Sequence, residues 1–484
     1  MWFHSWSAPM RAAEPLSSDQ PAPIVVVGAG MVGPVVAIYL ARRFGGVTLL
    51  ERQSAPAPAD PVPTGRSLHV VVSARGWHAL RDLGVEEQVL SISLPLRGRL
   101  EHSLTGKLTE QPYSRRGQEI WCVERSRLNR LLRAAAVATP GLRVRHDARV
   151  LAVEPDVPAV LVEGLEGIAG IEGTTGVEGR ARLTCEHVVG CDGAFSRVRE
   201  ALTDRHDRVQ MNTLGLGYKE IRIPAGPDGG WPLPHQFFHI WPRNRLLFSA
   251  FPNPGGDFTG SLFLPLHGDD ISFETIQTDG DAVALFQQLF PDVVSLIPDL
   301  AEQYESHPVN SIVTMSCDRW IWRDTVALVG DSAHAMAPFM GQGMNCGFED
   351  ARILDECLAR AGEPADWAGA FAEYESLRKP HVEAIAEVSI QHYQHLASPT
   401  TTATAQDVLR QRVTGRLYDV FSTKFTPLYE RCAFTEEPYA EALQQHLATE
   451  RLVDDVLIGR DGNALLDMSR NEFADVVNRS RPRT

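Results

Sequence analysis

Apolar and polar residues near the N-terminus alternate in blocks that predict a strand, a turn and a helix. The short β-branched run 23–27 stops at glycines and is followed by an apolar stretch of helical length, 32–41. A second apolar run, 47–50, ends at Glu51. Two parallel strands and the helix between them need about 30 residues, as found here. The chain is therefore expected to begin as a doubly wound α/β domain.

Later blocks of the sequence predict a sheet and then a helical region. Residues 215–266 are rich in aromatic and β-branched side chains, and the runs GYKEIRI and RLLFSAF are typical of strands. Beyond Pro380 glycines become few, and the amphipathic stretches 382–396 and 439–457 predict helices. The glycine- and glutamate-rich residues 161–179 are expected to form an extended hairpin or a mobile insert.

Length and composition exclude several classes of protein. With 484 residues the chain is longer than one core usually organises, so two or three structural units are expected. A net charge of -15 without a cluster of Lys and Arg argues against nucleic acid as a partner. No stretch approaches the roughly 20 apolar residues of a membrane span, and residues 1–22, without a signal-peptide core, are expected to be a flexible tail. The seven scattered cysteines include no C-x-x-C pair, which argues against a disulfide scaffold or a zinc site and favours a reducing cytoplasm.

The first turn carries the pattern G-x-G-x-x-G. Gly28 permits a tight turn, Gly30 lets backbone amides approach a pyrophosphate, and Gly33 lets the helix pack closely on the strand. Glu51 follows 18 residues after Gly33, where a carboxylate can accept hydrogen bonds from a ribose diol. The pattern alone is also compatible with an ordinary glycine-rich connection, but in this context it predicts dinucleotide binding. It does not distinguish FAD from NAD.

Two later segments point to FAD. Residues 188–199, VVGCDGAFSRVR, resemble the DG motif of class A flavoprotein hydroxylases, and residues 327–334, ALVGDSAH, resemble their second flavin fingerprint. The resemblance implies that Asp331 bonds the ribityl chain and that the following helix points its N-terminus at the flavin. Each segment alone is compatible with an ordinary strand-turn-helix junction, but three nucleotide motifs in the family's order favour FAD.

The resemblance extends to the kynurenine 3-monooxygenase family and covers nearly the whole chain after Pro23. It is carried by residues 65–67, 96–99, 111–113, 217–220, 239–242 and, most specifically, PFMGQGMN at 338–345. Together with the motifs above, it implies FAD contacts from Gly28, Gly30, Gly33, Glu51, Arg52, Arg125, Asp192, Gly193, Gly330, Asp331, Gly341, Gly343, Met344 and Asn345. For Arg125, a place on the solvated face of a helix stays open as the alternative.

The expected fold class is therefore α/β, with a Rossmann-like FAD-binding domain, a β-sheet substrate domain and a C-terminal helical region. The expected boundaries are 1–22 for the tail, 23–200 and 315–379 for the two parts of the FAD-binding domain, 201–314 for the sheet domain, and 380–484 for a helical cap. The FAD-binding domain is thus expected to be assembled from two separated stretches of chain.

The resemblance also implies a pocket for a small aromatic amino-acid-like substrate. In the family an Arg and a Tyr hold the substrate carboxylate, and they correspond to Arg99 and Tyr113; a second Tyr corresponds to Tyr429. A guanidinium presents a planar pair of donors that matches a carboxylate. The alternative is that Arg99 pairs with an acid such as Glu101.

The expected lining of this pocket departs from the family in several places. Leu247, Ser249 and Phe251 stand where the family has Met, Ile and Leu. Met340 replaces His or Phe, and His392, which either bonds a substrate amine or only fills space, replaces Asn. The serine removes an apolar contact and adds a hydroxyl, which favours a substituted or more polar ring. The other expected lining residues are Phe263, Pro338, Phe339 and Gln342.

The implied activity is that of an aromatic hydroxylase with FAD as cofactor and with NADPH and dioxygen as co-substrates. NADPH would reduce FAD, the reduced flavin would form a C4a-hydroperoxide, and the ring of L-kynurenine would take its terminal oxygen to give 3-hydroxykynurenine. No side chain is expected to act as a general base or nucleophile, and no metal is expected. Two alternatives stay open: hydroxylation of a modified kynurenine, tryptophan or anthranilate-like acid in a biosynthetic pathway, and a non-catalytic flavin-binding protein.

Overall fold

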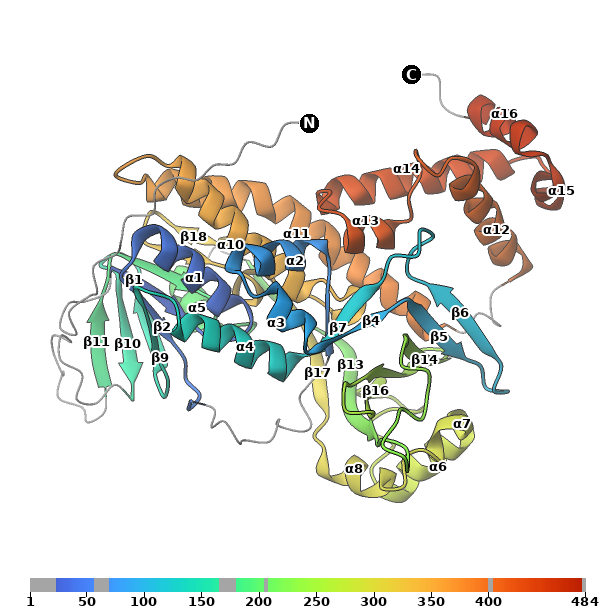
Figure 1. Ribbon diagram of the computed structural model, residues 1–484, viewed down its shortest axis with the longest axis horizontal. Helices are drawn as coiled ribbons and strands as arrows, with labels where there is room; N and C mark the ends of the chain where they lie inside the picture. The colour runs from blue at the N-terminus through green and yellow to red at the C-terminus, as the bar shows by residue number, and fades with distance from the viewer. Residues whose placement is uncertain (1–22, 56–68, 165–179, 204–207, 399–403, 481–484) are drawn as a thin grey trace.

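The computed structural model describes residues 23–55, 69–164, 180–203, 208–398 and 404–480. The predicted tail 1–22, the family motif at 65–67 and most of the predicted insert 161–179 lie outside the described residues. The described chain forms two large sheets, two three-stranded sheets and a group of C-terminal helices (Figure 1).

A six-stranded sheet forms the first large layer. In order, its strands are β18 (Ile321–Trp322), β19 (Val326–Leu328), β12 (His187–Gly190), β1 (Ile24–Val27), β2 (Val47–Leu50) and β8 (Leu142–Arg145). β18 pairs antiparallel with its neighbour, and the other neighbouring strands pair in parallel. The predicted strand, helix and strand at the N-terminus are β1, α1 (Val32–Phe44) and β2, with the helix reaching beyond residue 41.

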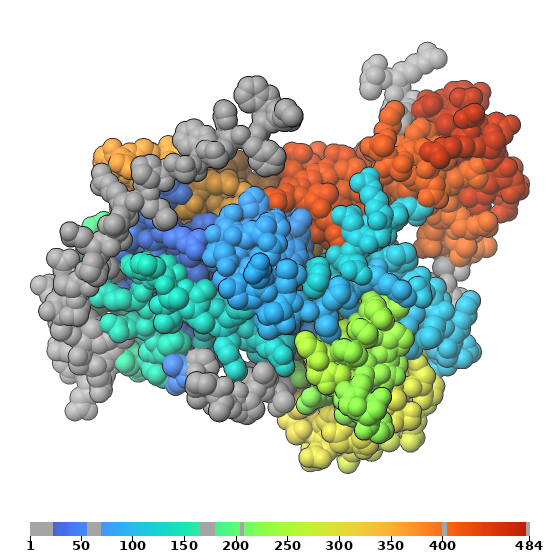
Figure 2. Space-filling model, viewed as in Figure 1, coloured from blue at the N-terminus to red at the C-terminus, as the bar shows by residue number. Residues whose placement is uncertain are grey.

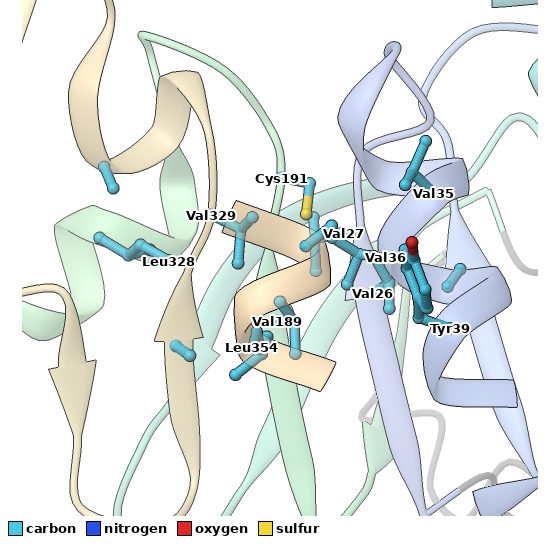
Figure 3. Packing of buried hydrophobic residues seen from close by; sticks show 14 of the residues in the cluster. Val26, Val27, Val35, Val36, Tyr39, Val189, Cys191, Leu328, Val329 and Leu354 are labelled. Atoms are coloured by element: carbon cyan, nitrogen blue, oxygen red, sulfur yellow. The ribbon is translucent and has the colours of Figure 1, made fainter. Parts of the chain in front are cut away.

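Helices bury the parallel sheet, which explains its continuous apolar strands. All residues of β1 and β2 are buried. In Figure 3, Val26 and Val27 of β1 lie beside Val36 of α1, and Val189 of β12 lies near Leu354 of α10 (Gly343–Arg360) in the same core cluster. This packing brings the carboxyl ends of the parallel strands to one edge of the sheet, where the predicted nucleotide turns follow.

A seven-stranded sheet forms the second large layer. In order, its strands are β17 (Asn310–Cys317), β13 (Val209–Ile223), β16 (Phe258–Pro265), β15 (Leu246–Pro252), β14 (Phe237–Arg243), β5 (Gly98–His102) and β6 (Leu108–Pro112). The predicted strand GYKEIRI lies in β13, and RLLFSAF overlaps β15. An apolar cluster joins this sheet to α6 (Asp279–Leu289), α7 (Pro291–Val294) and α8 (Leu300–Ser306), at the bottom of Figure 1.

Two strands of the second sheet come from the part of the sequence expected to belong wholly to the FAD-binding domain. β5 and β6 lie within residues 23–200, yet β5 pairs in parallel with β14. Local periodicity does not reveal which sheet a strand joins, because strand pairing is decided by packing between distant segments. The two domains are therefore interleaved along the chain, and residue 200 does not divide them.

Two three-stranded sheets and several helices complete the layers. One sheet orders β3 (His69–Val72), β7 (Ile120–Glu124) and β4 (Ser93–Leu96), and the other orders β11 (Arg180–Thr184), β10 (Ala159–Glu163) and β9 (Arg149–Glu154). β10 and β11 pair antiparallel, so the two ends of the predicted insert meet as hairpin strands. Helices between the strands are α2 (Ala74–Leu83), α3 (Glu86–Leu90), α4 (Arg125–Val137), α5 (Arg197–Leu202), α9 (Asp331–His334) and the 3-10 turn η1 (Pro338–Met340).

The C-terminal helical region begins earlier than the expected boundary at 380. α11 starts at Trp367 and continues through Pro380, because its packing against α10 and α14 outweighs the break that a proline favours. Arg116, after β6, donates to the Ser422 carbonyl at 3.0 Å. In Figure 2 a cyan part of the surface meets the orange-red surface of the C-terminal helices. Among the described helices, none is long and apolar enough to cross a membrane. The helices of this region are α11 (Trp367–Ala397), α12 (Ala405–Val420), α13 (Leu428–Phe434), α14 (Tyr439–Leu457), α15 (Gly462–Asp467) and α16 (Arg470–Ser480).

Candidate active site

The carboxyl ends of the parallel strands open on a cleft of about 660 Å³. Its walls come from the first glycine turn, α4, the turns after β12 and β19, and the start of α10. A cleft of this size at this edge of a parallel sheet is the usual place for a dinucleotide. Most of the predicted cofactor residues line it: Gly28, Gly30, Glu51, Arg52, Arg125, Asp192, Gly193, Asp331, Gly343 and Met344.

The three glycines of the first turn differ in the space that a Cβ would find at each position. Gly28 has a φ of +97°, and a Cβ there would lie 2.6 Å from the Cys191 carbonyl oxygen. A Cβ at Gly33 would lie 1.8 Å from the Gly28 carbonyl oxygen, so α1 touches the turn at this point. A Cβ at Gly30 would meet no described atom within 4 Å, so Gly30 is where a pyrophosphate has room to approach.

Glu51 follows β2 at the wall of the cleft. Its carboxylate accepts hydrogen bonds from the backbone amides of Ala29 at 2.8 Å and Gln53 at 2.9 Å, and it pairs with Arg133 at 3.3 Å. A carboxylate has about four acceptor positions, so capacity for a ribose hydroxyl remains. Glu51 therefore holds the glycine turn in place and also faces the cleft.

Helix α4 supplies side chains that the sequence reasoning missed. Asn129 and Arg133 donate to the Ala29 carbonyl at 3.1 and 2.6 Å, and both line the cleft. Positions 125, 129 and 133 share one helix face because they are spaced by four, a signal that was available in the sequence. Arg125 is exposed and lines the cleft, so its position fits both the predicted FAD contact and the alternative of a solvated helix face.

Asp192 organises the DG turn. Its Oδ2 accepts the backbone amides of Arg197 at 2.7 Å and Val198 at 3.2 Å, and its Oδ1 accepts the Ser196 hydroxyl. Burial raises the pKa of Asp192, and these hydrogen bonds oppose that shift. The aspartate thus joins the turn to the start of α5 and keeps Gly193 at the cleft wall.

The second fingerprint is shaped by a glycine and braced by an asparagine. Gly330, with a φ of +65°, turns β19 into α9 and brings Asp331 to the cleft. Asn345 is buried, and its side chain connects neighbouring segments. Its Oδ1 accepts a hydrogen bond from the Ser73 backbone amide at 2.9 Å, and its Nδ2 donates to two backbone carbonyls, including that of Val71 at 2.8 Å. These predicted cofactor residues do not line the cleft: Gly33, Gly330, Gly341 and Asn345.

A smaller cavity of about 90 Å³ is the neighbour of the cleft. The two share one segment, since Pro338 to Gly341 line the cavity while Gly343 and Met344 line the cleft. A ligand in the cavity therefore lies beside the segment 338–344, whose other end lines the cleft. Most of the predicted substrate residues line the cavity: Arg99, Tyr113, Leu247, Ser249, Phe251, Phe263, Pro338, Phe339, Met340, His392 and Tyr429.

Gln342 is the predicted substrate residue that the structure places elsewhere. Its side chain is fully buried, and its Oε1 accepts the Tyr439 hydroxyl at 2.8 Å. Gln342 follows the 3-10 turn η1, and its side chain does not line the cavity. Thr259 and Ser261 lie two and four positions before Phe263 on β16, so all three share one face of the strand. This spacing could have predicted from the sequence that they line the same cavity. Lining residues that sequence reasoning missed are His69, Val71, Phe238, Thr259, Ser261 and Leu396.

Arg99 brings a guanidinium into the cavity without an acidic partner among the described residues. Its Nε is buried and has no hydrogen-bond partner in the described chain, and its Nη1 lies 3.4 Å from His392 Nε2. The guanidinium carbon lies 5.8 and 5.7 Å from the ring centroids of Tyr113 and Tyr429, which stack at 5.2 Å. Glu101, the alternative partner, accepts a hydrogen bond from a glutamine of β6 at 2.8 Å. A cation held this way favours an anionic ligand, because burying it unpaired is costly.

The groups around Arg99 are held in their neutral forms. Burial lowers the pKa of His392 well below its usual value, and the charge of Arg99 lowers it further. Burial also raises the pKa of Tyr113 and of Tyr429, so both hydroxyls stay protonated. Arg99 therefore supplies the positive charge of this end of the cavity, and its neighbours supply hydrogen bonds and ring surface.

His69 is expected to make the protein less stable in mildly acidic solution. Burial lowers the pKa of His69 from 6.5 to about 4, so between these values the unfolded chain binds a proton that the folded chain does not. The free energy of unfolding therefore falls as the pH falls through this window, by about 2 kcal/mol at pH 5. The variant His69→Gln should lose this part of the pH dependence. Thermal unfolding of both proteins at neutral pH and at pH 5 measures it, and equal pH responses would contradict the assignment.

A buried ion-pair network lies behind the second fingerprint. The described residues include one group of potential metal ligands, His334, Cys346 and Asp350, whose ligand atoms lie within 4.8 Å of one another. Asp350 already bonds His334 at 2.5 Å and Arg378 at 2.7 Å, and Arg378 also lies 3.3 Å from the Cys346 sulfur. The arginine disfavours a metal cation here by repulsion, so this group is a charge network that supports α10.

Sequence comparisons relate the chain to proteins of known activity. Residues 21–236 and 295–389 match the FAD binding domain family. Kynurenine 3-monooxygenase of Myxococcus xanthus is 38% identical over 450 residues, which cover 92% of this chain and 93% of that protein. Kynurenine 3-monooxygenase of Salinispora arenicola is 37% identical over 434 residues, which cover 89% of this chain and 92% of that protein.

Solved structures share the fold at lower sequence identity. The tetrameric form of 2-methyl-3-hydroxypyridine-5-carboxylic acid oxygenase aligns with a TM-score of 0.62 and 20% identity, over 78% of this chain and 93% of that one. Tetracycline destructase Tet(55) aligns with a TM-score of 0.59 and 17% identity, over 86% of this chain and 98% of that one. On its sequence similarity over most of its length and its match to the FAD binding domain, the chain belongs to the kynurenine 3-monooxygenase family of FAD-dependent monooxygenases.

Proposed function

We propose that this enzyme hydroxylates an aromatic amino acid of the kynurenine type, converting L-kynurenine to 3-hydroxykynurenine with NADPH and dioxygen. The observation that carries the proposal is the Arg99 guanidinium, whose Nε has no partner among the described residues and which lies in the cavity beside two stacked tyrosines. A carboxylate matches its planar donors, and the aromatic lining offers ring surface to the rest of the substrate.

Two features of the cleft support FAD as the cofactor. Gly30 leaves room for a pyrophosphate, and Glu51 keeps acceptor capacity for a ribose hydroxyl. When bound, FAD supplies the redox chemistry, taking electrons from NADPH and activating dioxygen. The protein's part is to bind and orient the ring next to segment 338–344 and to exclude water with aromatic side chains such as Phe238 and Phe251. The aryl amine of kynurenine activates the adjacent ring carbon, so the hydroxyl enters ortho to the amine.

The purified protein is expected to be yellow, with about one FAD per chain, and to oxidise NADPH faster when L-kynurenine is added. Product analysis should find 3-hydroxykynurenine. A colourless protein that FAD does not reconstitute would contradict the cofactor assignment. A yellow protein that NADPH does not reduce would favour a non-catalytic flavin-binding protein, and a reducible one that no kynurenine stimulates would contradict the substrate alone.

A modified kynurenine is the second candidate substrate. It is favoured by the hydroxyls of Ser249 and Ser261, which line the cavity among many aromatic and aliphatic side chains. These hydroxyls could bond a substituent on the aromatic ring of the substrate. Tryptophan and anthranilate belong in the same substrate panel, because each also joins a carboxylate to an aromatic ring.

A further inference from the structure

Three side chains that line the substrate cavity present polar atoms without a well-aligned hydrogen bond among the described residues. We call His69, Ser249 and Ser261 the polar strip. Ser249 on β15 pairs directly with Ser261 on β16, so both hydroxyls lie on the same face of the sheet. Both serines are only 4 and 5% exposed, and neither hydroxyl bonds another described side chain or backbone group. A buried hydroxyl without a partner is unfavourable, so the pair is suited to a ligand that bonds it.

His69 adds a third polar group from a different sheet. It begins β3, and its ring stacks on Phe251 with centroids 5.5 Å apart and an interplanar angle of 10°. Its Nδ1 is buried and makes no well-aligned hydrogen bond among the described residues, and the nearby Asn253 side chain opposes the fall of the His69 pKa. Burial keeps the ring neutral, with a pKa of about 4, so it presents one donor and one acceptor. Thr259 differs from these three because its hydroxyl already accepts from Asn253 at 3.1 Å.

The serine pair lies across the sheet from the carboxylate site. Arg99 is on β5, and the strand order β5, β14, β15, β16 places Ser249 two strands away and Ser261 three strands away. With about 4.8 Å between neighbouring strands, the backbone separations across the sheet are roughly 10 and 14 Å. Phe238 lies opposite Arg99 in the strand register, and its ring stacks on that of Phe251 at 4.0 Å. Phe251 pairs with Thr259, so the serines lie one row further along, two residues away from this row on the same face of the sheet. A ligand whose carboxylate binds Arg99 and whose ring extends over Phe238 and Phe251 brings its ring edge to the part of the cavity lined by the two serines.

We propose that the polar strip recognises a hydrogen-bonding substituent on the ring of the substrate, so that this enzyme prefers a ring-hydroxylated aryl amino acid to one with an apolar ring edge. This inference rests on the proposed function, because it takes the Arg99 end as the carboxylate site. It goes further in assigning the ring specificity to three named side chains.

The test compares two kynurenines that differ in one ring substituent, a hydroxyl or a chlorine at the same position, with substituents at ring positions 4 and 5 tried in turn. Dissociation constants come from the change in flavin absorbance on titration of the holoenzyme, and kcat/KM comes from NADPH oxidation coupled to product formation. The wild-type enzyme is expected to favour the hydroxylated compound by about tenfold or more at one of these positions.

The double variant Ser249→Ala, Ser261→Ala should lose about tenfold in affinity for the hydroxylated compound and keep its affinity for the chlorinated one within about twofold. Ser311→Ala is the matched control, because Ser311 is exposed on β17 of the same sheet and does not line the cavity. Equal losses for both compounds, or a wild-type enzyme without preference at either position, would overturn the role of the strip and leave the proposed function standing. A wild-type enzyme that responds to no kynurenine would overturn both.

Discussion

Replacing Arg99 with alanine is expected to weaken substrate binding by about 100-fold or more while leaving the FAD content unchanged. Truncating one partner of a buried charge pair costs about 2–5 kcal/mol, and the substrate carboxylate would then be buried without a cation. Arg99 does not line the cofactor cleft, so FAD should be retained. The measurements are the dissociation constant of L-kynurenine for the holoenzyme and the ratio of flavin to protein absorbance.

Two control variants separate this role from a general effect of charge. Arg97→Ala removes a neighbouring arginine that is exposed, pairs with Glu110 at 3.5 Å and does not line the cavity, so binding should change little. Arg99→Lys keeps the charge without the planar pair of donors and should recover binding only in part. An Arg99→Ala protein with unaltered affinity would show that the substrate carboxylate binds elsewhere.

Gly33→Ala is expected to lower the stability of the apoprotein and its affinity for FAD together. The added methyl would lie 1.8 Å from the Gly28 carbonyl oxygen, so α1 or the turn has to move. Overpacking of a well-packed site costs about 1–3 kcal/mol or more. The shift would also misplace the backbone amides that face the pyrophosphate. Thermal unfolding of the apoprotein and titration with FAD measure the two effects separately.

Gly30→Ala provides the matched comparison within the same turn. A Cβ there meets no described atom within 4 Å, so the apoprotein should unfold at nearly the wild-type temperature. FAD affinity should still fall, because the methyl would occupy the space through which the cofactor approaches the turn. If Gly33→Ala left both quantities unchanged, the contact between α1 and the turn would be looser than the structure shows.

The cofactor cleft could be predicted from sequence to a large extent because its features are local. A strand, a G-x-G-x-x-G turn and a helix follow one another within a short stretch. Gly28 and Gly33 are required by close contacts within or beside that turn, and Gly30 leaves open space beside it. The exceptions were residues that act through distant contacts. Arg133 holds the Ala29 carbonyl from α4, and its spacing from Arg125 indicated the helix face but not this contact. Asn345 joins α10 to β3 and α2, a role without a signature in the neighbouring sequence.

The substrate cavity was predictable mainly through family resemblance. Arg99 and Tyr429 lie 330 positions apart in the chain, yet the guanidinium and the ring are 5.7 Å apart. Periodicity alone does not bring such positions together, because the pairing of strands and helices depends on packing over the whole molecule. For the same reason Gln342 turned inward to Tyr439, whereas Ser261 and His69 joined the wall of the cavity.

The sequence by itself determined the doubly wound start of the chain, the nucleotide turns and the family, since these depend on short runs of residues and on their spacing. Only the tertiary structure decided that β5 joins the second sheet and so carries Arg99 to the cavity, and that Ser249 and Ser261 face each other there. The physical reason is that a local turn is specified by the backbone conformations its own residues allow. A cavity is instead specified by which distant surfaces bury each other, and no single stretch of the chain contains that information.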